Sequence, residues 1–120
     1  MSKDIVRIIP TQTTPSIIID YGVSYAKISG KSIPEDAYDF YHTVTQKLIS
    51  IPELELDIDF EYLNSASLRY MTFLVTSELN LKKVIWYYEE DDTDMCDKAL
   101  MIKDIINKEK PGISFQVIEK

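Results

Sequence analysis

Nine residues between positions 53 and 61 constrain the fold of this chain more than any other segment. Apolar Leu54, Leu56, Ile58 and Phe60 alternate without a fault with acidic Glu53, Glu55, Asp57, Asp59 and Glu61. This period of two is that of a β-strand with one buried and one solvated face. A sheet with helices on both faces shows continuous apolar runs instead. We therefore expect helices mainly on one face, and a substantially exposed row of carboxylates on the other.

The remaining pattern alternates between helices and strands. Further strands are predicted at residues 5–9, 16–20, 23–29, 81–88 and 113–118, and helices at 34–49, 66–79 and from an acidic cap at 91–94 to about 108. Residues 16–29 are expected to form a hairpin. The order predicts an α/β fold: one domain over residues 1–120, with a mixed sheet, a leading β-hairpin and three main helices largely on one face.

Composition excludes several classes of function. The net charge of −7 argues against nucleic acid and against anionic membrane surfaces. A single Cys96 and a single His42 exclude an internal disulfide and a Cys/His zinc site. Lys3, Asp4 and Arg7 stand where a signal peptide needs apolar residues, and no apolar run is long enough to insert into a membrane. We expect a cytoplasmic protein without a cofactor.

No convincing catalytic set is found, so we predict a protein that is not an enzyme. Three widely spaced glycines cannot form a phosphate-binding loop. Carboxylates on one face of a strand lie about 6.8 Å apart, too far to hold one cation without further ligands. A small metal-dependent enzyme that uses the acidic strand face stays as the alternative from another class. A structural adaptor without a covalent switch is a third reading.

The segment Asn64-Ser65-Ala66-Ser67 joins the alternating strand to the second predicted helix. The first turns of the other two helices contain carboxylates, whereas this one has none and contains Arg69. Free N–H groups and the helix dipole favour an anion at such a position. A phosphate on Ser65 fits this vacancy, with Arg69 one turn away. The alternative is that Asn64 or Ser65 only caps the helix.

Four segments of the chain resemble the SiaC family of bacterial regulatory phosphoproteins. They are Thr14 to Ile17, Ile28 to Ala37, Asp57 to Ser67 and Trp86 to Tyr88. The similarity covers nearly the whole chain, and the Tyr-Leu-Asn-hydroxyl-x-Ser segment is its most specific part. The order of strand, phosphorylation site and helix also resembles the topology of anti-sigma-factor antagonists, by analogy only.

The resemblance implies a partner switch in signal transduction. In such a switch a cognate Ser/Thr protein kinase phosphorylates the hydroxyl residue after the Asn, and a PP2C-type phosphatase removes the phosphate. In the characterised type the unmodified protein binds and activates a diguanylate cyclase, which links it to cyclic-di-GMP signalling and biofilm regulation. By position the phosphorylated residue is Ser65, where the type member has threonine, and its surroundings are Asn64, Ala66, Ser67 and Arg69.

Overall fold

A single mixed sheet runs through the molecule, and every helix is placed relative to it. The computed structural model describes residues 4–120, which form six strands and three α-helices. The elements are β1 (Ile5–Ile8), β2 (Ser16–Asp20), β3 (Tyr25–Ser32), α1 (Ala37–Leu48), β4 (Leu54–Leu63), α2 (Ser65–Phe73), the π-helical segment η2 (Leu74–Glu78), β5 (Leu81–Tyr88), α3 (Thr93–Glu109) and β6 (Ser114–Glu119). Residues 1–3 of the predicted domain, including Lys3, lie outside the described part.

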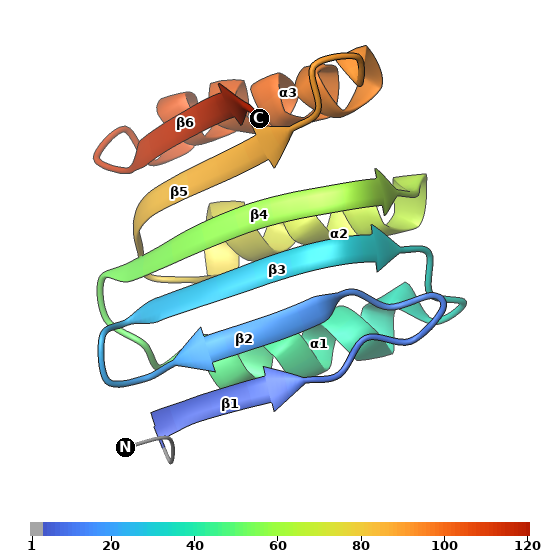
Figure 1. Ribbon diagram of the computed structural model, residues 1–120. Coiled ribbons are helices and arrows are strands. Elements are labelled where there is room, and N and C mark those ends of the chain that lie inside the picture. The colour runs from blue at the N-terminus through green and yellow to red at the C-terminus, as the bar shows by residue number, and fades with distance from the viewer. Residues whose placement is uncertain (1–3) are drawn as a thin grey trace.

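The strands lie in the sheet in the order in which they occur in the sequence, from β1 to β6 (Figure 1). The first three strands are antiparallel neighbours, and β2 and β3 form the predicted hairpin. From β3 to β6 all neighbours are parallel. Each parallel connection crosses through a helix, as alternating strands and helices require.

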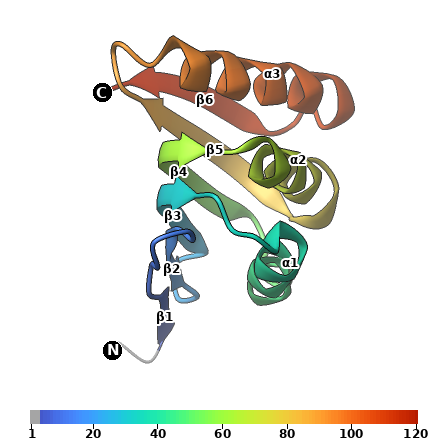
Figure 2. The same cartoon turned by 90° about the vertical axis from the view of Figure 1, so that its right-hand side faces the viewer.

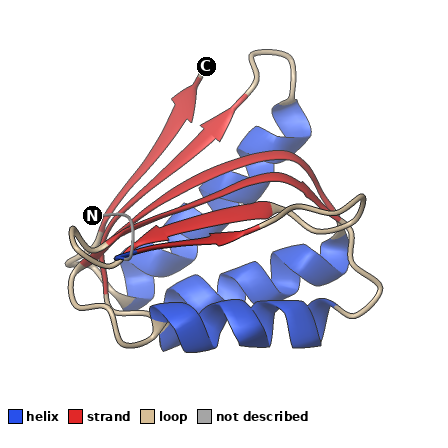
Figure 3. Ribbon diagram, turned by 60° about the horizontal axis from the view of Figure 1, so that its bottom comes forward, coloured by secondary structure: helices blue, strands red, loops and turns tan. Residues whose placement is uncertain are grey.

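All three helices cover the same face of the sheet, as the views from the side show (Figures 2 and 3). Leu54, Leu56, Ile58 and Phe60 are buried on that face. Both observations confirm the prediction from the alternating segment. These four β4 side chains form a continuous apolar core with Trp86 and with the inward residues of the helices.

The expected exposure of the acidic face is only partly right. Glu61 is exposed, but Glu55, Asp57 and Asp59 are half-buried. The Tyr25 hydroxyl donates a hydrogen bond to Asp57 Oδ2 at 2.8 Å. Lys120 Nζ pairs with Asp59 Oδ1 at 2.8 Å. Long side chains from neighbouring elements therefore cover carboxylates that an isolated strand leaves in water.

The first two helices differ from their predicted bounds. Asp36 caps α1 by accepting the N–H of Asp39 at 3.0 Å, so this helix begins after Pro34. The second helix was predicted as continuous over 66–79, but α2 ends at Phe73 and η2 follows. The N–H of Leu79 donates to the carbonyl of Leu74 at 3.3 Å, a five-residue step. This wider turn accompanies the burial of both leucines, which a regular helix places on different sides.

Within residues 4–120, no helix has the length and apolar character needed to cross a membrane. In the same described part, no three His, Cys, Asp or Glu side chains gather in a way that suits a metal ion.

Candidate functional site

All three α-helices begin at one edge of the sheet, where the parallel strands β3, β4 and β5 end (Figure 1). Each start has the same capping bond. Asp36, Asn64 and Asp92 each accept, through the side chain, the backbone N–H of the residue three positions later. The caps of α1 and α3 are therefore acidic and that of α2 is neutral.

The α2 start presents Ser65 to solvent. Asn64 Oδ1 accepts the N–H of Ser67 at 2.8 Å, so Asn64 and not Ser65 is the capping residue. Ser65 is the first residue of α2, and both Ser65 and Ala66 are exposed. The first turn contains no acidic residue, as the sequence indicated. The Ser65 hydroxyl is thus accessible at the positive end of a helix.

Ser67, the fourth residue of the predicted Asn64 to Ser67 segment, lies beneath the exposed Ser65. Its side chain is fully buried, and its Oγ accepts a hydrogen bond from Ser32 Oγ at 2.8 Å. Ser32 Oγ is also hydrogen-bonded to the Tyr41 hydroxyl, and the carbonyl of Ser32 accepts the N–H of Asn64 at 3.1 Å. This buried polar network joins the end of β3, helix α1 and the start of α2. Burial raises the pKa of Tyr41 to about 12.

A β-bulge immediately before the site changes which side chains face outward. Gly30 pairs with Phe60, but the next residue, Lys31, pairs with Tyr62, so β4 contains one extra residue here. Glu61 and Tyr62 are therefore both exposed, and Leu63 is buried. Without the bulge, the alternation of β4 would bury Tyr62.

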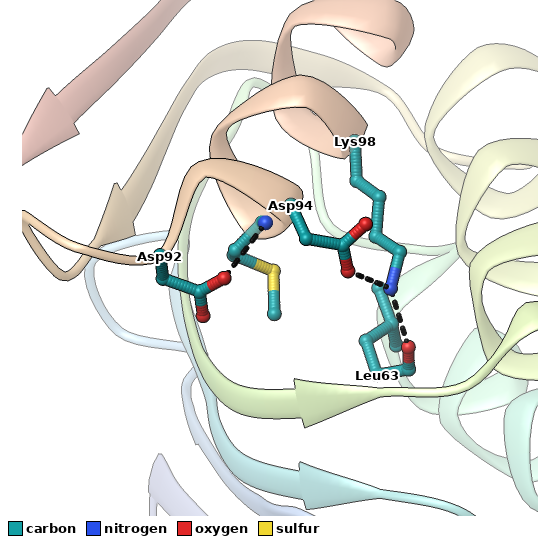
Figure 4. A network of polar contacts seen from close by, with 5 residues as sticks. Leu63, Asp92, Asp94 and Lys98 are labelled. Carbon is teal, nitrogen blue, oxygen red and sulfur yellow. Dashed lines mark hydrogen bonds and ion pairs between the residues drawn. The ribbon is translucent and has the colours of Figure 1, made fainter.

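A lysine from α3 reaches this same segment (Figure 4). Lys98 Nζ donates to the carbonyl oxygen of Leu63 at 2.8 Å and pairs with Asp94 Oδ2 at 2.9 Å. It also lies 5.9 Å from the centre of the Tyr62 ring. Sequence reasoning missed Lys98. The four-residue spacing from Asp94 signals the ion pair, but nothing in the sequence signals the contact with Leu63.

Arg69 is exposed and lines a groove between α1 and the α2–η2 segment. The groove has a volume of about 560 Å³, and its walls include Tyr38, His42 and Phe73. Ser65, Arg69 and Phe73 are all exposed and follow each other at four-residue steps along α2, so they form one stripe on its surface. Among the described residues, the Arg69 side chain makes no hydrogen bond to Asn64 or Ser65.

Thr93 occupies the position in α3 that Ser65 occupies in α2. It is the first residue of its helix and is exposed. Its neighbours are Asp92, the cap, and Asp94, in the first turn. The two hydroxyls thus share backbone position and exposure but differ in the charge around them.

Comparison with known proteins gives consistent matches. A family model described as SiaC family regulatory phosphoprotein matches residues 8–119. A structure of SiaC of Pseudomonas aeruginosa is similar with a TM-score of 0.75 and 21% identity, covering 97% of this chain and 98% of that one. A chain in the crystal structure of the diguanylate cyclase SiaD in complex with its activator SiaC, from the same organism, has a TM-score of 0.77 and 21% identity over 96% and 99% of the two chains. The search of curated proteins found no match.

Proposed function

Because the chain belongs to the SiaC family of regulatory phosphoproteins, we propose that it is a phosphorylation-controlled switch that acts by binding other proteins. A cognate Ser/Thr protein kinase adds phosphate to Ser65, and a PP2C-type phosphatase removes it. The unmodified form binds an effector, and the phosphorylated form releases it. We take a diguanylate cyclase as the effector, since a relative of the same fold is found in complex with one.

One observation carries this proposal: Ser65 is exposed at the first position of a helix whose first turn has no acidic residue. A phosphoryl group adds about −1.5 to −2 charges at neutral pH. The N–H groups and dipole of α2 receive that charge with little cost to the fold. Buried Ser67 offers a kinase no access, so Ser65 is the preferred acceptor of this serine pair.

The surface beside Ser65 supports a direct effect of the phosphate charge on binding. The stripe Ser65, Arg69 and Phe73 leads into the aromatic groove between α1 and α2. A partner that covers this stripe buries the phosphate, and burying charge for which the partner supplies no matching cation costs several kcal/mol. Affinity falls about tenfold for each 1.4 kcal/mol.

In this proposal the protein acts in the cytoplasm, where it meets its kinase, phosphatase and effector. It catalyses no reaction itself, and the enzymes of the pathway are its partners. The segment from Leu63 to Arg69 is then a substrate for two enzymes and a contact surface for a third.

Phosphorylation mapping tests the assignment of the acceptor. The purified chain is incubated with the cognate kinase and ATP, and phosphopeptides are located by mass spectrometry. We expect one phosphate, on Ser65, that is lost in the Ser65→Ala variant and removed by the phosphatase. The Thr93→Ala variant is the matched control and keeps full phosphorylation. Phosphate on Thr93, or unchanged labelling of Ser65→Ala, would contradict the proposal.

A further inference from the structure

The environment of Lys98 is unusual for a lysine on a surface helix. Its side chain is only 20% exposed, and its ammonium group contacts a backbone carbonyl on another element, Leu63 of β4. Lys108, on the same helix, forms an ordinary exposed ion pair and serves for comparison. It pairs with Asp104 at 3.1 Å through the same four-residue spacing, but both side chains are about 70% exposed (74% and 67%). The spacing alone therefore does not explain where the Lys98 ammonium lies.

The contact places a positive charge beside the segment that carries Ser65. Leu63 is two residues before Ser65, and its carbonyl oxygen is 2.8 Å from Lys98 Nζ. An ammonium group has three N–H donors. Within the described residues, Leu63 and Asp94 take two of them, and the Tyr62 ring lies nearby. The third N–H can donate to a new acceptor without loss of the contacts already made.

We propose that Lys98 is the intramolecular ligand of the phosphate on Ser65, and that phosphorylation ties the start of α3 to the start of α2. This inference rests on the proposed phosphorylation of Ser65. A phosphate dianion attracts the ammonium more strongly than the single charge of Asp94 does. Arg69 is the rival ligand, but among the described residues its side chain makes no hydrogen bond to Asn64 or Ser65, whereas Lys98 already contacts this segment through Leu63.

Phosphorus NMR on protein with phosphoserine installed at position 65 during translation tests this ligand directly. The readout is the second pKa of the phosphate, which a nearby cation lowers. The compared proteins are the phosphorylated parent and its Lys98→Met, Lys98→Arg, Arg69→Met and Lys108→Met variants. Lys108→Met is the matched control, because it removes a lysine from an equivalent ion pair elsewhere on α3.

We expect Lys98→Met to raise the phosphate pKa by roughly half a unit to one unit, with Lys98→Arg restoring the parent value. Lys108→Met should leave it unchanged. An equal pKa in the Lys98→Met and Lys108→Met proteins, or a rise confined to Arg69→Met, would overturn the assignment.

If Lys98→Met does not fold, a crystal structure of the phosphorylated parent tests whether Lys98 binds the phosphate. It should place Lys98 Nζ about 3 Å from a phosphate oxygen, and a lysine that contacts only Leu63 and Asp94 would overturn the proposal. Neither measurement uses the kinase or the effector. Failure of Lys98 to bind phosphate and failure of the proposed switch are therefore separate results.

Discussion

Ser65 and Thr93 offer a comparison within one molecule. Both are exposed hydroxyl residues at the first position of a helix, and both helices start where a parallel strand ends. The capping bonds are alike, at 2.8 Å from Asn64 and 3.0 Å from Asp92. The difference is charge, because Thr93 lies between two aspartates and Ser65 has no acidic residue in its first turn.

Under the proposed phosphorylation of Ser65, charge and not backbone geometry distinguishes the two helix starts. Both helix starts offer free N–H groups and a positive dipole end. At α3 the carboxylates of Asp92 and Asp94 already supply the negative charge, and a phosphate there meets repulsion. The first turn of α2 contains no carboxylate, and the ammonium group of Lys98, which also pairs with Asp94, contacts the Leu63 carbonyl beside it.

The buried residues beneath the two helix starts also differ. The largest effect that we predict is on unfolding at alkaline pH, which tests the burial of Tyr41 beneath α2. The third residue of α2 is Ser67, bonded to Ser32 within the network that includes Tyr41, whereas the third residue of α3 is buried Met95. An unfolded tyrosine has a pKa of about 10, and folding raises that of Tyr41 to about 12. Between these values the unfolded chain loses a proton that the folded chain keeps.

Stability should therefore fall as pH rises through this window, by roughly 2–3 kcal/mol at most for Tyr41 alone. Urea titrations from pH 8 upward should show a shallower loss in the Tyr41→Phe variant. Tyr38→Phe, on the same helix but 56% exposed, is the control and should follow the parent. The same slope in the parent and in Tyr41→Phe would show that burial does not hold Tyr41 neutral. Burial also raises the pKa of Tyr25, as does its hydrogen bond to Asp57, and that contribution is common to all three proteins.

Exchanging the two caps gives a smaller effect of opposite sign at the two sites. Asn and Asp cap helices about equally well, so the exchange changes charge and keeps the cap. Asn64→Asp should stabilise the protein by about 0.3–1 kcal/mol, and Asp92→Asn should destabilise it by a similar amount. Chemical denaturation by urea at low ionic strength measures both. Added salt should reduce both differences. Destabilisation by Asn64→Asp would remove the electrostatic distinction between the two helix starts.

The sequence was sufficient for the features that depend on local periodicity. The alternation of residues 54–60 predicted a strand with one buried face and helices on one side, and both are found. The lack of acid in the first turn of α2 was also readable, because it needs only the position of the helix start. The resemblance to the SiaC family is confirmed by the family model over residues 8–119.

The features that were missed depend on contacts between distant segments. Lys98 is 35 positions from Leu63, and Ser67 is 35 positions from Ser32, so no local pattern connects either pair. The half-buried state of Asp57 comes from Tyr25 in another strand. The bulge that exposes Tyr62 and the π-helical segment after Phe73 both depart from regular periods, and only packing against the rest of the fold determines them.

Calorimetric titration of a cognate diguanylate cyclase tests the central claim most directly. The titrated proteins are the unmodified chain, chains with phosphate installed at Ser65 or at Thr93, and the Ser65→Ala variant, with circular dichroism to confirm that all four are folded. Phosphate on Ser65 should weaken binding about a hundredfold or more. Phosphate on Thr93 and the Ser65→Ala substitution should leave the affinity within about tenfold of the unmodified chain. Equal affinities of the unmodified and Ser65-phosphorylated proteins would contradict the account.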